Sequence, residues 1–226
     1  MQPRFLGRLS AADAVTTANA ALGFFAAVAA TVDTGLAARL ILLAAIADGL
    51  DGVVARKVGS SDAGEYLDSL ADVASFGVAP ALLIACTAKE VWSWGSEPLL
   101  FAAGIALPGL FVAMAVVRLG LYTVLDTGSD ETEGVQTTLS ATILAAGVLA
   151  GFVTPPMLVA LAGVLAIMMV TTVTYPDLHW QDALVMGVVQ ALAILLTGFP
   201  GRVFAWGLLF LALAYTVAGP SLYWRR

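Results

Sequence analysis

Long apolar segments recur along almost the whole chain, and they constrain its fold more than any other feature. A helix that spans a bilayer needs roughly 20 mostly apolar residues. Eight windows are candidates: 14–32, 36–57, 64–87, 98–124, 137–153, 156–174, 184–198 and 202–218. With 60% hydrophobic and 12% charged residues among 226, the chain has more apolar surface than a soluble globule can bury. The sequence therefore predicts an all-α, polytopic membrane helix bundle.

The distribution of Lys and Arg predicts how the bundle is oriented, because positive charge is retained on the cytoplasmic side. If the N-terminus is inside, seven of the ten basic residues also fall inside: Arg4, Arg8, Arg56, Lys57, Arg118, Arg225 and Arg226. Arg39, Lys89 and Arg202 fall outside. We therefore expect a multi-pass protein of the cell membrane with both termini in the cytoplasm. The net charge of −6 argues against a nucleic-acid partner.

The stretch DGLDGVVARKVGSSDAGEYLDSLAD, residues 48–72, places four acids in this apolar chain. Asp48 and Asp51 are three residues apart, and Asp68 and Asp72 are four apart, so each pair lies on one face of a helix. The turn KVGSSDA between the pairs makes the two helices antiparallel neighbours. The four carboxylates are thus expected to face each other near the membrane surface.

Carboxylates within a membrane span are costly and also repel one another, so we expect a divalent metal to hold them. Oxygen ligands without His or Cys favour Mg²⁺, Mn²⁺ or Ca²⁺, and four carboxylates suit two ions about 4 Å apart. Small residues at Gly49, Gly52, Ala55 and Gly64 leave the helix surfaces open to a bulky polar ligand. Arg56 supplies a planar cation suited to a phosphate.

A cation transporter is a different class of protein that also uses intramembrane aspartates. Arg56 argues against it, because a cation pathway has no use for a fixed positive charge beside its carboxylates. Binding of a nucleotide together with metal would separate the two hypotheses. Asp62, in SSDAGE, is expected to cap the following helix.

The spacing Asp-x2-Asp-Gly-x2-Ala-Arg-x7-Gly-x3-Asp-x3-Asp resembles the signature of the CDP-alcohol phosphotransferases. Members of that family displace CMP from a CDP-linked lipid or alcohol with a hydroxyl acceptor. The resemblance implies that Asp48, Asp51 and Asp68 bind two Mg²⁺ or Mn²⁺ ions. It also places Asp72 at the same metal cluster and makes it the general base.

An upstream segment, TTANAALG, is similar to the family's Thr-x2-Asn-x3-Gly element and places Thr16, Asn19 and Gly23 near the same site. The resemblance assigns the CDP moiety to Thr16, Asn19, Gly52, Ala55, Arg56 and Gly64.

The acceptor is indicated by LDSLADVASFGVAPALL, which resembles the phosphatidylserine synthase branch of the family. Branches that use glycerol phosphate or inositol phosphate place Lys or Arg where Val73 stands here. L-Serine is therefore the expected acceptor, and the two phosphorylated alcohols are the alternatives. For Ser75 and Phe76 we expect packing roles, as a hydroxyl between helices and a core aromatic.

Two later segments depart from the serine branch. RLGLYT keeps Arg118 but has Leu121 and Thr123 in place of Arg and Asn. EGVQTTLSAT has Gln136 and Thr138 where the family has prolines. Arg118 is expected to bind the acceptor carboxylate or a lipid phosphate, or else to anchor the topology at the membrane surface.

The resemblance extends over six helices. We therefore expect residues 1–174 to form the CDP-alcohol phosphotransferase membrane core and residues 175–226 to form a two-helix membrane extension. The expected activity is metal-dependent transfer of a phosphatidyl group from a CDP-activated lipid to serine, with release of CMP. In a halophilic archaeon the group would be archaetidyl. The resemblance also implies a homodimer in the bilayer.

Overall fold

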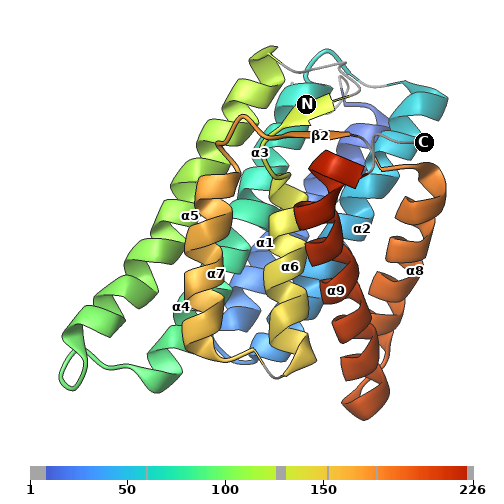
Figure 1. Cartoon of the computed structure of the whole chain (residues 1–226). Coiled ribbons are helices and arrows are strands. Elements are labelled where there is room, and N and C mark those ends of the chain that lie inside the picture. Colours follow the sequence, from blue (N-terminus) through green and yellow to red (C-terminus); the bar gives the residue numbers. More distant parts are fainter. Residues whose placement is uncertain (1–8, 60, 126–130, 152, 177, 223–226) are drawn as a thin grey trace, which may run out of the picture.

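The structure, a computed structural model, describes residues 9–59, 61–125, 131–151, 153–176 and 178–222. In this part of the chain the helices form eight rods that run up and down one bundle, as predicted (Figure 1). One rod consists of three consecutive segments, α3, the π-helical η2 and α4. The bounds are α1 Ala11–Ala30, α2 Thr34–Val58, α3 Gly64–Asp72, η2 Val73–Val78, α4 Ala79–Val91, α5 Pro98–Leu125, α6 Thr137–Ala150, α7 Pro155–Met168, α8 Trp180–Leu195 and α9 Gly198–Leu222.

Four rods are long and apolar enough to cross a membrane by length and composition: α1, the rod from α3 to α4, α5 and α9. The helices α6, α7 and α8 are apolar but shorter. The 25-residue helix α2 has the length, but it carries Arg39, Asp48 and Asp51. Its acids are tolerated because neighbouring helices shield them from lipid. The chain is thus a multi-pass membrane protein.

Because the number of described rods is even, the start of α1 and the end of α9 lie at the same end of the bundle (Figure 1). Arg56 and Lys57 lie in the last turn of α2 at this end. Arg39 and Arg202 lie near the starts of α2 and α9, at the opposite end. Arg4, Arg8, Arg225 and Arg226 lie outside the described residues, and the cytoplasmic orientation stays a prediction.

Local chemistry explains where several helices begin and end. Ser10 and Asp13 form a capping box at the start of α1, and Asp33 caps α2 by accepting a hydrogen bond from the Leu36 N–H. Gly151 has φ of +77° and ends α6 at Ala150, three residues before the predicted end. The expected cap by Asp62 is wrong, because α3 begins after Ala63 with no side-chain cap hydrogen bond.

A short antiparallel clip, absent from the sequence prediction, joins two connections at the end of the bundle that holds the chain ends (Figure 1). The strands β1 (Glu131–Glu133) and β2 (Thr174–Pro176) pair with Thr132 opposite Tyr175. The buried Tyr175 hydroxyl donates a hydrogen bond to the Thr216 carbonyl of α9 (3.1 Å). The helix α7 ends at Met168, six residues before the predicted end at 174, and the Met168 carbonyl accepts a hydrogen bond from the Val135 N–H instead of continuing the helix.

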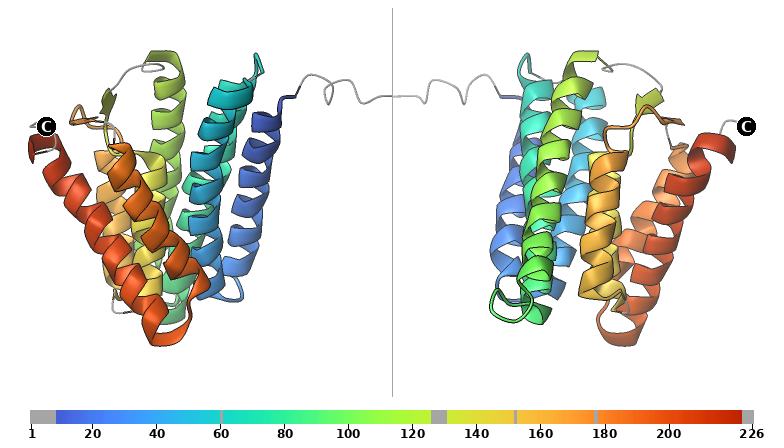
Figure 2. Two further views of the ribbon diagram at one scale, coloured as in Figure 1. Left: turned by 90° about the vertical axis from the view of Figure 1, so that its right-hand side faces the viewer. Right: turned by 60° about the vertical axis from the view of Figure 1, so that its left-hand side comes forward.

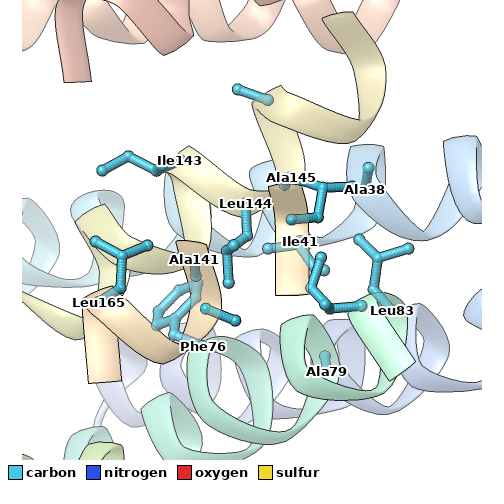
Figure 3. Close-up of a cluster of buried hydrophobic side chains, with 14 of the residues drawn as sticks. Ala38, Ile41, Phe76, Ala79, Leu83, Ala141, Ile143, Leu144, Ala145 and Leu165 are labelled. Atoms are coloured by element: carbon cyan, nitrogen blue, oxygen red, sulfur yellow. The ribbon is translucent and has the colours of Figure 1, made fainter. Parts of the chain in front are cut away.

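The apolar core surrounds α6, which is buried on nearly all sides. Figure 3 shows side chains of α2, η2, α4, α6 and α7 meeting in this cluster. Phe76 of η2 is fully buried there, together with Ile41 of α2 and Leu144 of α6. The predicted core role of Phe76 is confirmed.

The C-terminal helices α8 and α9 pack side by side and lean relative to the other helices (Figure 2). Two polar contacts fix them to α2: Gln190 Nε2 donates to the Leu42 carbonyl in a buried bond (2.7 Å), and Arg39 Nη2 donates to the Leu196 carbonyl in a partly buried one (3.2 Å). Because polar groups in an apolar surrounding require partners, these bonds set the position of the pair against α2. A domain division at residue 174 stays a prediction.

The helix α1 approaches η2 closely at Gly23. A Cβ atom at this position would lie 2.6 Å from Ser75 Oγ and 2.7 Å from Ser75 Cα. Ser75 is fully buried, and its hydroxyl donates to the Asn19 carbonyl of α1 (2.8 Å). The predicted packing role of Ser75 is confirmed. The absence of a side chain at Gly23 therefore allows the backbones of α1 and η2 to pack in direct contact.

We predict that Gly23→Ala lowers the free energy of unfolding by about 1–3 kcal/mol, because the new methyl group collides with backbone atoms of η2. Thermal denaturation in detergent, followed by circular dichroism, measures the effect. Gly187→Ala in α8 is the control, since a Cβ there meets nothing within 4 Å. Equal melting temperatures for the two variants would contradict the packing account.

Candidate active site

Three buried polar residues follow one side of α1 at intervals of three: Asp13, Thr16 and Asn19. At 1.5 Å of rise per residue, successive members lie about 4.5 Å apart along the helix axis. They define an outer, a middle and an inner level, counted from the end of the bundle where α2 ends and α3 begins (Figure 1). Each level meets acids or small residues of α2 and α3.

Hydrogen bonds from α1 fix two of the aspartates. Thr16 Oγ1 donates to Asp51 Oδ2 at the middle level (2.8 Å). Asn19 Nδ2 is 3.4 Å from Asp72 Oδ1 at the inner level. Both acids are only 8% exposed, so the bonds orient carboxylates that lie largely away from solvent.

The carboxylates of Asp48, Asp68 and Asp72 converge between α2 and α3. Each offers one oxygen, and these oxygens lie within 4.8 Å of one another. Thr138 Oγ1, at the start of α6, is 3.5 Å from Asp48 Oδ2. The predicted facing of the two acidic pairs is thus observed, with Asp51 beside the cluster and bound to Thr16.

The donor set of this cluster fits a divalent cation. Asp68 Oδ1 and the neighbouring Asn19 Oδ1 are buried and have no hydrogen-bond partner among the described residues. Buried oxygens normally have partners, and a bound ion would satisfy these atoms while offsetting the repulsion between the carboxylates. Oxygen ligands alone favour Mg²⁺, Mn²⁺ or Ca²⁺.

A pocket of about 180 Å³ lies above the cluster, between α1, α2 and α3. Its floor contains Asp51 and Asp68, and Gly52, Ala55 and Gly64 give its walls little side-chain bulk. Its lining also contains Thr16, Ala12, Asp13 and Glu65. Six residues that the sequence predicted for the site therefore line one pocket.

Of the other predicted residues, Arg56 and Asn19 lie beside the pocket, whereas Arg118 lies on α5. Arg56 is exposed, and its Nη1 lies 3.5 Å from the position of a Cβ on Gly52, which places the guanidinium over that glycine. Asn19 lies one helical turn below the pocket, next to Asp72. Arg118 is a buried residue of α5 with its guanidinium 5.6 Å from the centre of the Tyr122 ring, and it is not part of this pocket's described lining.

Sequence reasoning missed Asp13, Glu65 and Thr138. A signal for Asp13 was present, because it continues the three-residue spacing of Thr16 and Asn19 along α1. The position of Glu65, directly after Gly64 of the signature spacing, could also have indicated it. Nothing local marks Thr138, whose contact with Asp48 joins residues 90 positions apart.

We predict that the purified protein binds Mn²⁺ and that Asp48→Asn weakens this binding at least about tenfold, because an amide is a poorer ligand than a carboxylate. Electron paramagnetic resonance of free Mn²⁺ measures the affinity without substrate. Asp62→Asn, an exposed acid of the α2–α3 turn, is the control. Equal Mn²⁺ affinities in the Asp48 variant and wild type would exclude Asp48 as a ligand.

Sequence comparisons agree with this geometry. The sequence model of the family described as CDP-alcohol phosphatidyltransferase matches residues 9–175. The archaetidylserine synthase of Methanothermobacter thermautotrophicus is 31% identical over 176 residues, which cover 76% of this chain and 71% of that protein. The CDP-diacylglycerol–serine O-phosphatidyltransferase of Methanocaldococcus jannaschii is 63% identical over 46 residues, 20% of this chain and 23% of that protein. The chain belongs to the CDP-alcohol phosphatidyltransferase family.

Proposed function

We propose that this chain transfers the phosphatidyl or archaetidyl group of a CDP-activated lipid to the hydroxyl of L-serine and releases CMP. One observation carries the proposal. The signature residues of α2 and α3 and the polar residues of α1 meet around one pocket with a carboxylate cluster at its base. The relatives named for serine transfer support the choice of reaction.

The position of the pocket suits a substrate with one polar and one apolar end. It lies where α2 ends and α3 begins, near the end of a membrane-spanning bundle. A CDP-activated lipid bound there keeps its nucleotide in water and its tails in the bilayer. We place this end in the cytoplasm, following the basic residues Arg56 and Lys57.

Asp48, Asp51, Asp68 and Asp72 are the residues that would hold Mg²⁺ or Mn²⁺ ions, two in number by the family resemblance. When bound, the ions supply positive charge to the diphosphate. Thr16 and Asn19 orient Asp51 and Asp72 through their hydrogen bonds. The first role of the protein is therefore to preorganise its own carboxylates.

Asp72 is proposed as the general base. It is largely buried, and the Asn19 side chain holds one of its oxygens. As the serine hydroxyl oxygen attacks the lipid-bearing phosphorus, its proton passes to Asp72. The new phosphorus–oxygen bond forms as the bond to the bridging oxygen breaks, and CMP leaves in line with the attack.

The CDP moiety is proposed to contact Thr16, Asn19, Gly52, Ala55, Arg56 and Gly64. The absence of bulky side chains at Gly52, Ala55 and Gly64 allows close approach to the helix backbones. Arg56, above Gly52, is positioned to pair with a phosphate at the exposed side of the pocket.

The residue next to the general base Asp72 indicates which acceptor is used. Val73 comes directly after Asp72 at the start of η2 and offers no cation for a second phosphate. This favours serine over glycerol phosphate or inositol phosphate. We also propose that two copies associate in the bilayer, as the family resemblance implies.

We predict that CMP is released from a CDP-activated lipid with Mn²⁺ when serine is offered, and not with glycerol 3-phosphate or inositol phosphate. Asp72→Asn should reduce this release at least about 100-fold, the usual range for loss of a general base. CMP is quantified chromatographically with detergent-purified protein, and Asp62→Asn is the control. Release with another acceptor would overturn the serine assignment, and metal binding without any nucleotide binding would favour cation transport.

We further predict that Arg118→Gln raises the KM for serine about tenfold or more, because a charge-assisted hydrogen bond to the serine carboxylate is lost. The KM for the CDP-activated lipid should stay unchanged. Steady-state kinetics with each substrate varied separately makes the distinction. A rise in the lipid KM alone would instead assign Arg118 to a lipid phosphate, and two unchanged values would reduce it to a structural role.

A further inference from the structure

The first turn of α6 presents a hydroxyl to the carboxylate cluster. Thr138 is half-buried, and its Oγ1 is 3.5 Å from Asp48 Oδ2. In the described part of the chain, this carboxylate is the sole hydrogen-bond partner of the hydroxyl. Position 138 is also one of two at which the chain departs from the family element by replacing a proline. Because a proline side chain has no donor, the contact does not follow from the family pattern.

Three of the four aspartates receive a hydrogen bond from a neutral side chain of another helix. Thr16 donates to Asp51, and Asn19 donates to Asp72, both from α1. The first turn of α6 supplies the corresponding contact to Asp48. A bond to one oxygen leaves the other oxygen of each carboxylate available to an ion. Groups that hydrogen-bond to a metal ligand in this way orient the ligand and raise the affinity of the site.

The hydroxyl of Thr138 is carried by a firmly held part of the fold. Two backbone hydrogen bonds fix the chain that leads into α6: Gly134 N–H donates to the Val173 carbonyl (2.8 Å), and Val135 N–H donates to the Met168 carbonyl (3.1 Å). The helix α6 itself is buried on nearly all sides. A β-branched side chain also has few χ1 rotamers. The hydroxyl can therefore orient a carboxylate with little loss of conformational freedom.

Helix capping does not explain the position of this hydroxyl. The N-cap residue of α6 is Gln136, and no side chain makes a cap hydrogen bond there. The neighbouring Thr137 is 1% exposed, and its hydroxyl has no hydrogen-bond partner among the described residues. Of these two adjacent threonines, Thr138 alone contacts an aspartate of the cluster. Thr137 is therefore a matched control for the loss of a hydroxyl from the same turn.

We infer that Thr138 is a positioning residue of the proposed metal site, and that it fixes the Asp48 carboxylate through a hydrogen bond from its hydroxyl. The inference rests on the proposed function, because it needs a divalent ion at the cluster. Thr138 is assigned no contact with the ion or the substrate, and it acts through Asp48. Loss of such a supporting bond lowers metal affinity about 10- to 100-fold. The length of this contact places the expected effect at the lower end of that range.

The test measures the Mn²⁺ affinity of the full-length, detergent-purified protein by electron paramagnetic resonance of free Mn²⁺, without substrate. Thr138→Val keeps the shape of the side chain but lacks the hydroxyl, so it should weaken binding about tenfold. Thr138→Ala repeats the test with a smaller side chain. Thr138→Ser keeps the hydroxyl and should bind Mn²⁺ nearly as well as the wild type. Thr137→Val, the control, should leave the affinity unchanged.

A double-mutant cycle separates an action through Asp48 from a general effect on the fold. Thr138→Val should have little further effect on Mn²⁺ affinity in the Asp48→Asn protein, because the carboxylate that it positions is already lost. Independent, multiplicative effects of the two substitutions would overturn the inference. Wild-type affinity in Thr138→Val, or an equal loss in Thr137→Val, would overturn it as well. Failure of the wild-type protein to bind Mn²⁺ would instead overturn the proposed metal site itself.

Discussion

Lipid cannot solvate charge, and this constraint determines how the first three rods of the bundle are arranged. The acids of α2 and α3 must face inward, and α1 supplies the polar side that covers them. Thr16 and Asn19 each use a side chain to hold one aspartate. Because the same contacts also join the helices, the stability of this region and the orientation of its carboxylates have one physical origin.

Close backbone packing makes that arrangement possible. Gly23 lets α1 approach η2, where the Ser75 hydroxyl meets the Asn19 carbonyl. The Asn19 side chain in turn faces Asp72, the last residue of α3. The π-helical segment thus begins directly after a proposed catalytic group, in agreement with the frequent occurrence of such segments at functional sites. Apolar packing around the fully buried Phe76 also holds this segment in the core.

The sequence predicted the bundle, the pairing of the acids and most of the pocket, because these depend on local spacing. Asp48 and Asp51 share a face through helical periodicity alone, and apolar length marks each rod. Prediction failed where distant segments decide the outcome. The helix expected to reach residue 174 ends at Met168, where the chain between β1 and α6 bonds to its last carbonyl, and the contact of Thr138 with Asp48 depends on how α6 enters the core. The cap expected at Asp62 does not form, because the chain places Ala63 at the N-cap position of α3 and no side chain caps the helix.

The pair of strands β1 and β2 connects the last helix, α9, to the carboxylate cluster through a series of hydrogen bonds. Tyr175 is anchored to α9 through the Thr216 carbonyl, and its strand pairs with β1. The chain from β1 leads through Gly134, whose N–H is bound to the Val173 carbonyl, directly into the first turn of α6 and Thr138. A shift of α9 would therefore be transmitted, through one pair of strands, to the hydroxyl that faces Asp48. The last helix is thus connected to the carboxylate cluster through hydrogen-bonded segments without contributing a ligand to it.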